Sequence, residues 1–337
     1  MVTLPSVIDG NSAAFWSNGE LGLFHSSGIP SISRGRNQFS LSTTQRIQFD
    51  SPGHEPVWFE AAWQDDDGTL FLWYHHEPGG VCKGNSLTAP TVGAAVSYDG
   101  GATVHDLGIV LESGDRIDCG AKNGFFAGGH GDASVVLDRE RKYFYLFFTN
   151  YGGPLWEQGV AVARMAFEDR FQPAGAVHKY YADKWMEPGI GGHVEPIFPA
   201  VREWQREDTD SYWGPSIHWN THMEQFVILL NHACCAPGWP QEGIYVTWNA
   251  DLSQPSGWRA PERLLAKLQI GHSPGYYPQV LGLEEGQTDS IAGAVARLYV
   301  HGRSAWEIVF SKVPPLPRTP PEPCPEDSPD CADDHIN

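Results

Sequence analysis

The chain repeats one short pattern several times, and this repeat limits its fold more than any other feature. Residues 129–150 hold the clearest copy, in which a polar turn with His130 and Asp132 leads into an apolar run, a charged reversal and an aromatic run. Two such runs, separated by about five polar residues, predict a β-hairpin. Further copies begin near residues 11, 60, 214 and 278, and a third short strand can be placed after each.

A degenerate repeat of three or four short strands is typical of the blades of a β-propeller. Five copies therefore predict an all-β, five-bladed β-propeller that forms a single domain over residues 1–313. An irregular sandwich of two sheets is the alternative. The composition agrees with either fold, because 41% hydrophobic residues suffice for a packed core, and 37 glycines and 26 prolines suit many tight turns.

The repeats also divide the chain. Residues 2–16 are expected to supply the opening strand of the first blade, and a long insertion without regular structure is expected at 182–212, where such a segment is usually functional or disordered. The Pro-rich acidic residues 314–337 predict a disordered tail. The other blades are expected at 56–112, from about 130 to 181, at 213–268 and at 276–313.

The charge of the chain excludes some classes of partner. Lys and Arg number 22 against 41 Asp and Glu, a net charge of −19, so we expect neither nucleic acid nor an anionic membrane surface as a partner. No apolar run reaches the roughly 18 residues of a membrane-spanning helix. The first residues do not resemble a signal peptide. The compartment stays open: cytoplasmic, or secreted or periplasmic if a leader has been removed. We expect a monomer.

Six cysteines leave the disulfide pattern open. Cys82 and Cys119 could pair, but sequence alone does not give connectivity. Cys234 and Cys235 are adjacent, and Cys324 and Cys331 lie in the tail. No pair has the spacing of a zinc motif, so we do not expect structural zinc.

Propeller geometry predicts which residues meet. The first strands of all blades begin at one face of the hub, and the turns between second and third strands return to that face. We expect this face to hold the functional site, since sites on such scaffolds lie in loops at one end. The first-strand group is Asn11, Glu60, Asp132 with His130, Trp213 with Pro215, and Tyr277. The turn group is His25, His75 or His76 with Glu77, Asn150 with Tyr151, Asn231 with His232, and His301 with Arg303.

Two motifs carry a resemblance to a known family. Gly131-Asp132-Ala133-Ser134, with the aromatic run after it, resembles the Ile-Asp-Pro motif of five-bladed glycoside hydrolases, the arabinanase, xylosidase and invertase relatives. Trp213-Gly214-Pro215 is similar to their Glu-Gly-Pro motif. The resemblance implies a protein that hydrolyses glycosidic bonds in an oligo- or polysaccharide. It also implies that Asp132 holds the sugar and tunes the pKa of the general acid.

The chain departs from the family where the acid and base are expected. Trp213 stands in place of the acid and cannot donate that proton, and Asn11 stands in place of the base, with Asp9 two residues before it. Glycoside hydrolysis needs two carboxyl groups with different pKa values. We expect the pair to be rebuilt from Asp132, Glu60 and Glu195. The alternative is a carbohydrate-binding propeller without catalysis.

Other residues are candidates for binding. The expected substrate-binding residues are Asn11, His76, His130, Tyr151, Trp213, His218, Tyr277 and Arg303. Neighbouring residues of a strand point to opposite faces, so only one of His75 and His76 can face the hub, and we take His76. Imidazoles and carboxylates together suit a divalent ion. A calcium or transition-metal ion in the hub is therefore a further hypothesis, with His25, His76 and His130 as its ligands.

Overall fold

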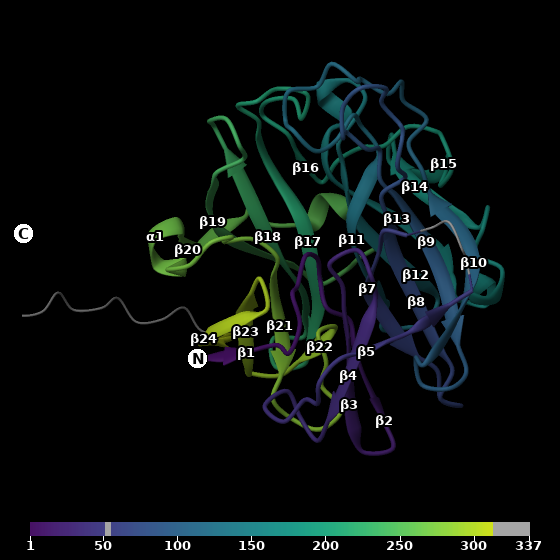
Figure 1. Ribbon diagram of the computed structural model, residues 1–337, viewed down its shortest axis with the longest axis vertical. Coiled ribbons are helices and arrows are strands. Elements are labelled where there is room, and N and C mark those ends of the chain that lie inside the picture. Colours follow the sequence, from purple (N-terminus) through teal and green to yellow (C-terminus); the bar gives the residue numbers. More distant parts are fainter. Residues whose placement is uncertain (51–54, 313–337) are drawn as a thin grey trace, which may run out of the picture.

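The computed structural model describes residues 1–50 and 55–312. Its strands form five sheets, and each sheet begins with an inner strand at a common hub. Figure 1 shows the inner strands β7, β11, β17 and β21 near the middle of the molecule and the outer strands β10, β15 and β20 at its periphery. The predicted five-bladed β-propeller is confirmed. The tail at 314–337 lies outside the described residues.

Blades 1 and 5 close the ring. Blade 1 consists of β2 (Ala14–Ser17), β3 (Glu20–His25), β4 (Ser31–Gly35) and β5 (Gln45–Arg46). Blade 5 consists of β21 (Pro278–Gly282), β23 (Val295–Val300), β24 (Arg303–Val309) and β1 (Val2–Thr3). The expectation that residues 2–16 form one opening strand is wrong, because β1 pairs with β24 as the outermost strand of the last blade. This pairing joins the start of the chain to its last blade.

Blades 2 and 3 contain five and six strands. Blade 2 contains β7 (Val57–Gln64), β8 (Leu70–His76), β9 (Thr91–Ser97), β10 (Thr103–Leu111) and β6 (Gln48–Phe49), which runs parallel to β10. Blade 3 contains β11 (His130–Leu137), β12 (Tyr143–Asn150), β13 (Gly159–Ala166), β14 (Val177–Tyr181), β15 (Lys184–Pro188) and β16 (Phe198–Pro199). The predicted insertion at 182–212 is thus not irregular throughout, because β15 and β16 extend blade 3 and β17 begins within it.

Blade 4 contains β17 (Asp210–Asn220), β18 (Gln225–Cys234), β19 (Gln241–Asn249) and β20 (Glu262–Ala266), with β22 (Ile291–Ala292) parallel to β17. Helices are short: the 3-10 turns η1 (Leu155–Glu157), η2 (Phe167–Phe171) and η3 (Pro255–Gly257), and α1 (Lys267–Ile270). Among the described residues, no helix has the length and apolar character needed to cross a membrane.

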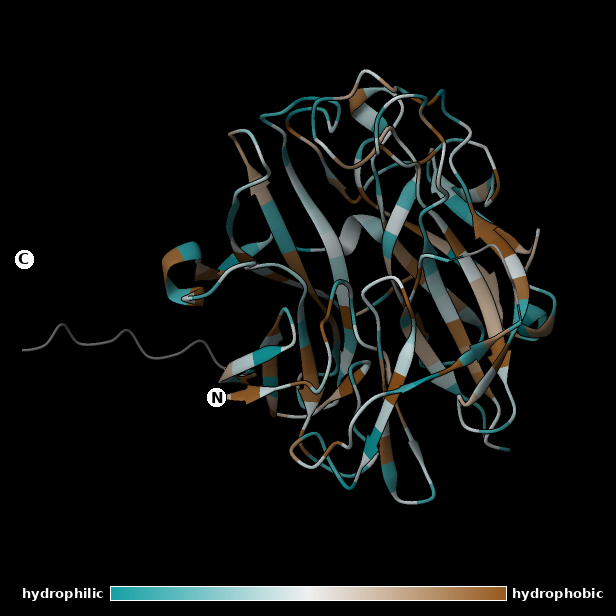
Figure 2. Ribbon diagram, in the orientation of Figure 1, coloured by the Kyte–Doolittle hydropathy of each residue, from teal (hydrophilic) through white to brown (hydrophobic). Residues whose placement is uncertain are grey.

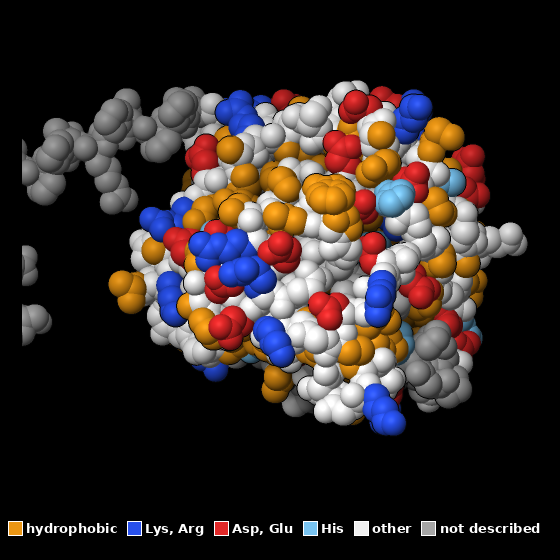
Figure 3. Space-filling model, turned by 90° about the horizontal axis from the view of Figure 1, so that it is seen from above, with side chains coloured by type: hydrophobic (Ala, Val, Ile, Leu, Met, Phe, Trp, Pro, Cys, Tyr) orange, Lys and Arg blue, Asp and Glu red, His pale blue; other side chains and the backbone are white. Residues whose placement is uncertain are grey.

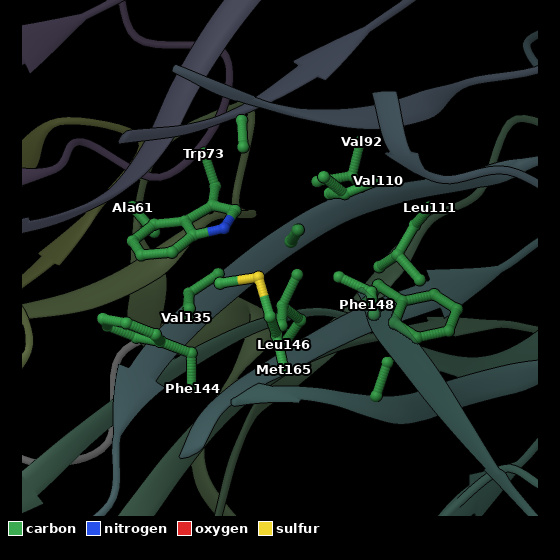
Figure 4. Close-up of a cluster of buried hydrophobic side chains, with 14 of the residues drawn as sticks. Ala61, Trp73, Val92, Val110, Leu111, Val135, Phe144, Leu146, Phe148 and Met165 are labelled. Atoms are coloured by element: carbon green, nitrogen blue, oxygen red, sulfur yellow. The ribbon is translucent and has the colours of Figure 1, made fainter. Parts of the chain in front are cut away.

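The core lies between neighbouring blades. Figure 2 shows hydrophobic residues concentrated on the strands and hydrophilic ones in many of the connecting loops. The cluster in Figure 4 joins blades 2 and 3, where Trp73 of β8 packs with Val135 of β11 and Phe144 of β12. Each such side chain contributes roughly 1.5–3 kcal/mol when fully buried. β8 has an apolar residue on each face, since Trp73 belongs to the cluster shared with blade 3 and Leu72 to the cluster shared with blade 1.

Three inner strands carry a β-bulge near the hub. The pairing register shifts between Phe59 and Ala61 in β7, between Gly131 and Ser134 in β11, and between Trp213 and Ser216 in β17. A bulge re-aims a side chain away from the alternating pattern. Glu60 and Asp132 lie in two of these bulges, and Asp132 adopts a left-handed backbone with φ of 47°. Such a conformation is strained for a non-glycine residue and is common at functional sites.

The described cysteines are paired. Cys82 and Cys119 form a disulfide with 5.4 Å between their Cα atoms, and Cys234 is joined to Cys235. The open question of the Cys82 partner is thereby answered. Cys324 and Cys331 lie outside the described residues.

Candidate functional site

Two carboxyl groups meet at the hub. Glu60 and Asp132, from neighbouring inner strands, are each only 2% exposed. The Glu60 Oε2 accepts the backbone N–H of Ala133 at 2.7 Å, which ties blade 2 to blade 3 beside Asp132. The fold thus brings together two of the three carboxyls that the sequence suggested.

His75 links this pair to the surface of the hub. The backbone N–H of Asp132 donates to His75 Nδ1 at 2.8 Å, and His75 Nε2 lies 3.2 Å from Glu77 Oε1. Burial acts to lower the pKa of His75, whereas the hydrogen bond to Glu77 and the charges of Asp132 and Glu60 act to raise it. The amide hydrogen bond at Nδ1 decides the protonation state. A protonated Nδ1 could not accept the Asp132 amide. We therefore assign the neutral tautomer, with Nε2–H donating to Glu77.

Two tyrosines complete the surroundings of Asp132. The Tyr151 hydroxyl donates to Oδ2, and the Tyr277 hydroxyl donates to Oδ1 at 3.0 Å. Burial, together with the charge of Asp132, raises the pKa of both tyrosines, so both stay neutral and act as donors. Donors that face a carboxylate favour its ionised form. Tyr151 and Tyr277 therefore lie where the sequence placed them.

These contacts separate the two carboxyls electrostatically. Burial raises the pKa of Glu60, and the nearby charge of Asp132 adds to this effect. Burial also raises the pKa of Asp132, but the two tyrosine hydroxyls oppose the rise. Two close, buried carboxylates do not readily ionise together. We assign the proton to Glu60 and the negative charge to Asp132.

Two further carboxyls, Asp9 and Glu77, lie half-buried at the rim. Burial raises the pKa of Asp9 to about 6, and the charges of Asp132 and Glu77 add to this effect. The segment containing Asp9 rests on Glu60, since a Cβ on Gly10 would come within 2.8 Å of Glu60 Oε1. A glycine is needed here for this close approach.

Aromatic rings form one wall of the site. Trp213 lies 5.4 Å from the Tyr277 ring and 5.8 Å from the Tyr276 ring, and its indole N–H donates to Gln241 at 3.2 Å. The ring of Tyr151 packs against that of Phe126, with 4.4 Å between the ring centroids and 39° between the ring planes. Trp213, at the position of the family's acid, is 4% exposed and belongs to this packing. Asn11 is also buried, and its Nδ2 donates to the Pro215 carbonyl at 2.9 Å, joining blades 1 and 4 across the hub.

Three predicted site residues lie elsewhere. Glu195 is exposed and accepts the Ala182 N–H at 2.8 Å, because the insertion follows blade 3 outward and not toward the hub. His218 is fully buried near Phe310, and burial lowers its pKa to about 3. Arg303 is exposed on β24, an outer strand beside β1. The expectation that these three share the hub is contradicted.

The predicted metal ligands do not converge either. His25 Nε2 bonds Ser33 at 2.5 Å within blade 1, and His76 Nδ1 bonds the Pro56 carbonyl at 3.2 Å. His130 Nε2 lies 3.2 Å from the ammonium group of the buried Lys179, and burial together with Lys179 lowers the pKa of His130. The choice of His76 over His75 is wrong, because strand alternation puts His75 on the side of Trp73, which faces blade 3.

Asp9, His75, Glu77 and Tyr276 were not among the predicted catalytic or binding residues, although Glu77 with either His75 or His76 was expected at this face. A signal existed for His75, since the Phe71–Trp73 alternation marks one face of β8 and His75 continues it. Asp9 precedes a glycine, which is a sign of close approach. No pattern in the sequence marked Tyr276 as distinct from its neighbour Tyr277.

One set of residues could offer a metal ion several ligand atoms. Glu60, His75 and Asp132 each provide one, and these atoms lie within 4.8 Å of one another. However, His75 Nδ1 already accepts an amide, and both Asp132 oxygens accept tyrosine hydroxyls. An ion here would have to displace these donors, so the residues do not form an open site for it.

Comparison with known proteins rests on the fold. No family model and no curated protein sequence matches the chain. Among solved structures, a thermostable family-43 glycoside hydrolase is 13% identical with a TM-score of 0.55, covering 89% of this chain and 87% of its own. The α-L-arabinofuranosidase of Lactobacillus brevis is 12% identical with a TM-score of 0.54, covering 92% and 93%. The chain has the fold of these glycoside hydrolases.

A third neighbour extends the likeness. The arabinanase of Bacillus subtilis is 12% identical with a TM-score of 0.50, covering 88% of this chain and 91% of its own. At such identities the likeness concerns the five-bladed glycoside hydrolase fold and not the side chains of the hub. On the face seen in Figure 3, acidic, basic and hydrophobic side chains are interspersed, without one large basic area.

Proposed function

We propose that this protein hydrolyses a glycosidic bond of an oligo- or polysaccharide. The observation that carries the proposal is the layered group of carboxyls at the hub, with Asp9 and Glu77 at the rim and the buried pair of Glu60 and Asp132 beneath them. Glycoside hydrolysis needs one carboxyl that donates a proton and one that activates water or attacks the sugar. The fold supports the substrate class, because the solved structures that share it act on arabinans and galactans.

Asp9 is the proton donor in this proposal. It is half-buried, so a sugar can reach it, and its pKa of about 6 is high for an aspartate. Such a carboxyl keeps a proton under mildly acidic conditions and can transfer it to the glycosidic oxygen as the bond breaks. Asp9 also belongs to the first blade, close to the position where the sequence resemblance expects the base and finds Asn11.

Glu77 is the partner carboxyl. The chain of hydrogen bonds from the Asp132 amide through His75 ends on Glu77 Oε1, which orients this side chain toward the rim. Glu77 would accept a proton from the attacking water or attack the anomeric carbon itself. Asp132 touches neither reacting atom and acts as a positioning residue, because its charge raises the pKa of Asp9. The protonated Glu60 limits the negative charge buried beneath the site.

The test is product formation. Purified protein is incubated with 1,5-arabinan, arabino-oligosaccharides, β-1,3-galactan and nitrophenyl arabinofuranosides, and reducing ends are measured from pH 4 to 8. We expect turnover on at least one of these, falling as pH rises through about 6, as Asp9 loses its proton. Asp9→Asn should lower kcat by about 100-fold or more. Full activity in Asp9→Asn would refute the assignment.

Two alternatives have specific tests. A carbohydrate-binding propeller without catalysis would show sugar affinity by calorimetry and no product after long incubation, and the burial of Glu60 favours it. A metal-dependent enzyme rests on the 4.8 Å cluster of Glu60, His75 and Asp132. Elemental analysis of protein purified without chelator, together with activity after chelator treatment, decides that case. The expected monomer stays a prediction, which light scattering can test.

A further inference from the structure

A second cavity adjoins the hub between blades 4 and 5. It measures about 230 Å³ and is lined by Trp239 and Gln241 of blade 4, by Lys267 of α1, and by His272 and Tyr276 of the loop before β21. This volume is smaller than that of most ligand sites, which is roughly 300–1,000 Å³, and suits a single sugar residue better than a chain.

Tyr276 forms the wall between the cavity and the site. Its ring packs on Trp213 at 5.8 Å on one side and on His301 at 5.3 Å on the other. Its pKa is raised by burial and by the charges of Asp9 and Asp132, which places its hydroxyl in the field of the hub. A sugar residue held against Tyr276 in the cavity would therefore lie next to the sugar residue whose glycosidic oxygen Asp9 protonates.

The cavity is lined by one cation, Lys267, although the chain as a whole is acidic. No Asp or Glu lines it, whereas Asp66 and Asp138 line the cavity at the opposite end of the hub. Burial lowers the pKa of His272 and that of His301, the latter to about 4. The positive charge of Arg303 lowers both further, so Arg303 lies close to the two rings. Within the described ranges, neither Lys267 nor Arg303 has a hydrogen bond or an ion pair with a carboxylate.

The cavity also has a buried polar group without a partner. The indole Nε1 of Trp239 is buried and has no hydrogen-bond partner among the described residues. The ring nitrogens of His272 are also buried, and the Pro274 backbone acts on one of them. Buried polar groups in proteins are nearly always hydrogen-bonded, so unpaired ones that line a cavity indicate a polar ligand. A neutral imidazole offers one donor and one acceptor, and an indole offers one donor, a set that matches sugar hydroxyls.

We propose that this cavity binds an anionic sugar residue, one that carries a carboxylate or a sulfate, next to the bond that the hub cleaves. Lys267 and Arg303 attract the anionic group, Trp239 and Tyr276 flank the ring, and His272 bonds its hydroxyls. The preferred substrate then carries an acidic residue beside the cleaved bond, and a wholly neutral arabinan or galactan is a poorer one. This inference rests on the proposed hydrolase function, but binding of the sugar can be measured without turnover.

The probes are D-glucuronate, galactose 6-sulfate and, as neutral controls, D-glucose and D-galactose, with binding followed by NMR titration of the full chain. We expect at least one charged sugar to bind about tenfold more tightly than its neutral counterpart, with the preference shrinking at high salt. Preference for the glucuronate identifies a uronic-acid glycan, and preference for the sulfate ester identifies a sulfated one. Equal affinities for charged and neutral sugars would overturn the inference.

Variants test which residues cause the preference for charged sugars. Lys267→Ala/Arg303→Ala should abolish the preference, whereas the control Arg139→Ala/Lys184→Ala, which removes the same charge at exposed positions away from the cavity, should keep it. A preference that survives in the first double variant contradicts the proposal. Binding as expected without hydrolysis of any glycan would refute the proposed function and leave the cavity assignment standing. Hydrolysis of neutral glycans without binding of charged sugars would refute the cavity assignment and leave the proposed hydrolase function standing.

Discussion

The two ends of the hub use the same residue types in opposite ways. At one end, Glu60 and Asp132 are buried and bonded to amide and hydroxyl groups. At the other end, the turns after β7 and β11 hold Asp65, Asp66 and Arg141, where Arg141 contacts Asp65 at 3.3 Å and Asp66 at 3.4 Å. Both ends adjoin the same inner strands, and at the first end burial raises the pKa values of Glu60 and Asp132.

This comparison shows that burial determines how strongly the charge of each carboxyl group acts on its neighbours. Asp66 is 87% exposed, so water screens its charge, and an ion pair of this kind contributes about 0–1 kcal/mol to stability. Glu60 and Asp132 lack that screening, so each charge acts on its neighbours across the hub. A buried ionisable group without partners would be costly. The β-bulges and the tyrosines supply the partners at the first end only.

The strongest test of this contrast is Asp132→Asn. Removal of the charge should lower kcat by about 100-fold or more and move the alkaline limb of the pH profile to lower pH, because the Asp132 charge raises the pKa of Asp9. A pH series of kcat on the best substrate measures both effects. A merely structural role for Asp132 would lower activity without moving the limb.

The next test concerns stability and pH. The pKa of Glu60 is raised above its ordinary value of 4.5, so the folded state holds a proton that the unfolded chain releases as pH rises above that value. The contribution of Glu60 to stability is therefore present below about pH 4.5 and lost as pH rises through its raised pKa. Glu60→Gln does not titrate, and its free energy of unfolding should fall less between pH 5 and 8. Urea unfolding at several pH values measures this, and parallel curves for the two proteins would contradict the assignment.

A smaller effect is expected from Tyr277→Phe. The change removes one of the two hydroxyls that donate to Asp132, which should cost about 1–3 kcal/mol of stability because the carboxylate oxygen stays buried. Activity should fall less than in Asp132→Asn, since Tyr151 still donates. Thermal unfolding and kcat measure the two effects. A fully stable and active variant would show that the Tyr277 hydroxyl does not support the carboxylate.

The smallest effect is expected from Asp66→Asn at the opposite end. It makes the same chemical change as Asp132→Asn, but at an exposed ion pair, so the free energy of unfolding should change by less than about 1 kcal/mol. Turnover and its pH profile should match those of the wild type. A loss of activity here would break the contrast between the two ends.

The repeat, together with the alternation of side chains along each strand, predicted much of the site. Glu60, Asp132, Tyr151 and Tyr277 were predicted to meet because equivalent positions of a repeat return to one face, and they do. Glu195 and Arg303 were misplaced because they follow elements that run outward, along blade 3 and on the outer strand β24. His218 lies too far along β17, and an alternating pattern does not indicate depth along a strand.

The sequence by itself determined the five-bladed architecture, since local hairpins with alternating apolar residues have few other ways to bury two faces. It also determined that Glu60, Asp132, Tyr151 and Tyr277 meet at one face. Only the tertiary structure decided that Asp9 lies at the rim over Glu60, that His75 and not His76 connects Asp132 to Glu77, and that a cationic cavity adjoins Tyr276. These relations depend on bulges and on loops from different blades, and burial between such segments sets pKa values that no local pattern encodes.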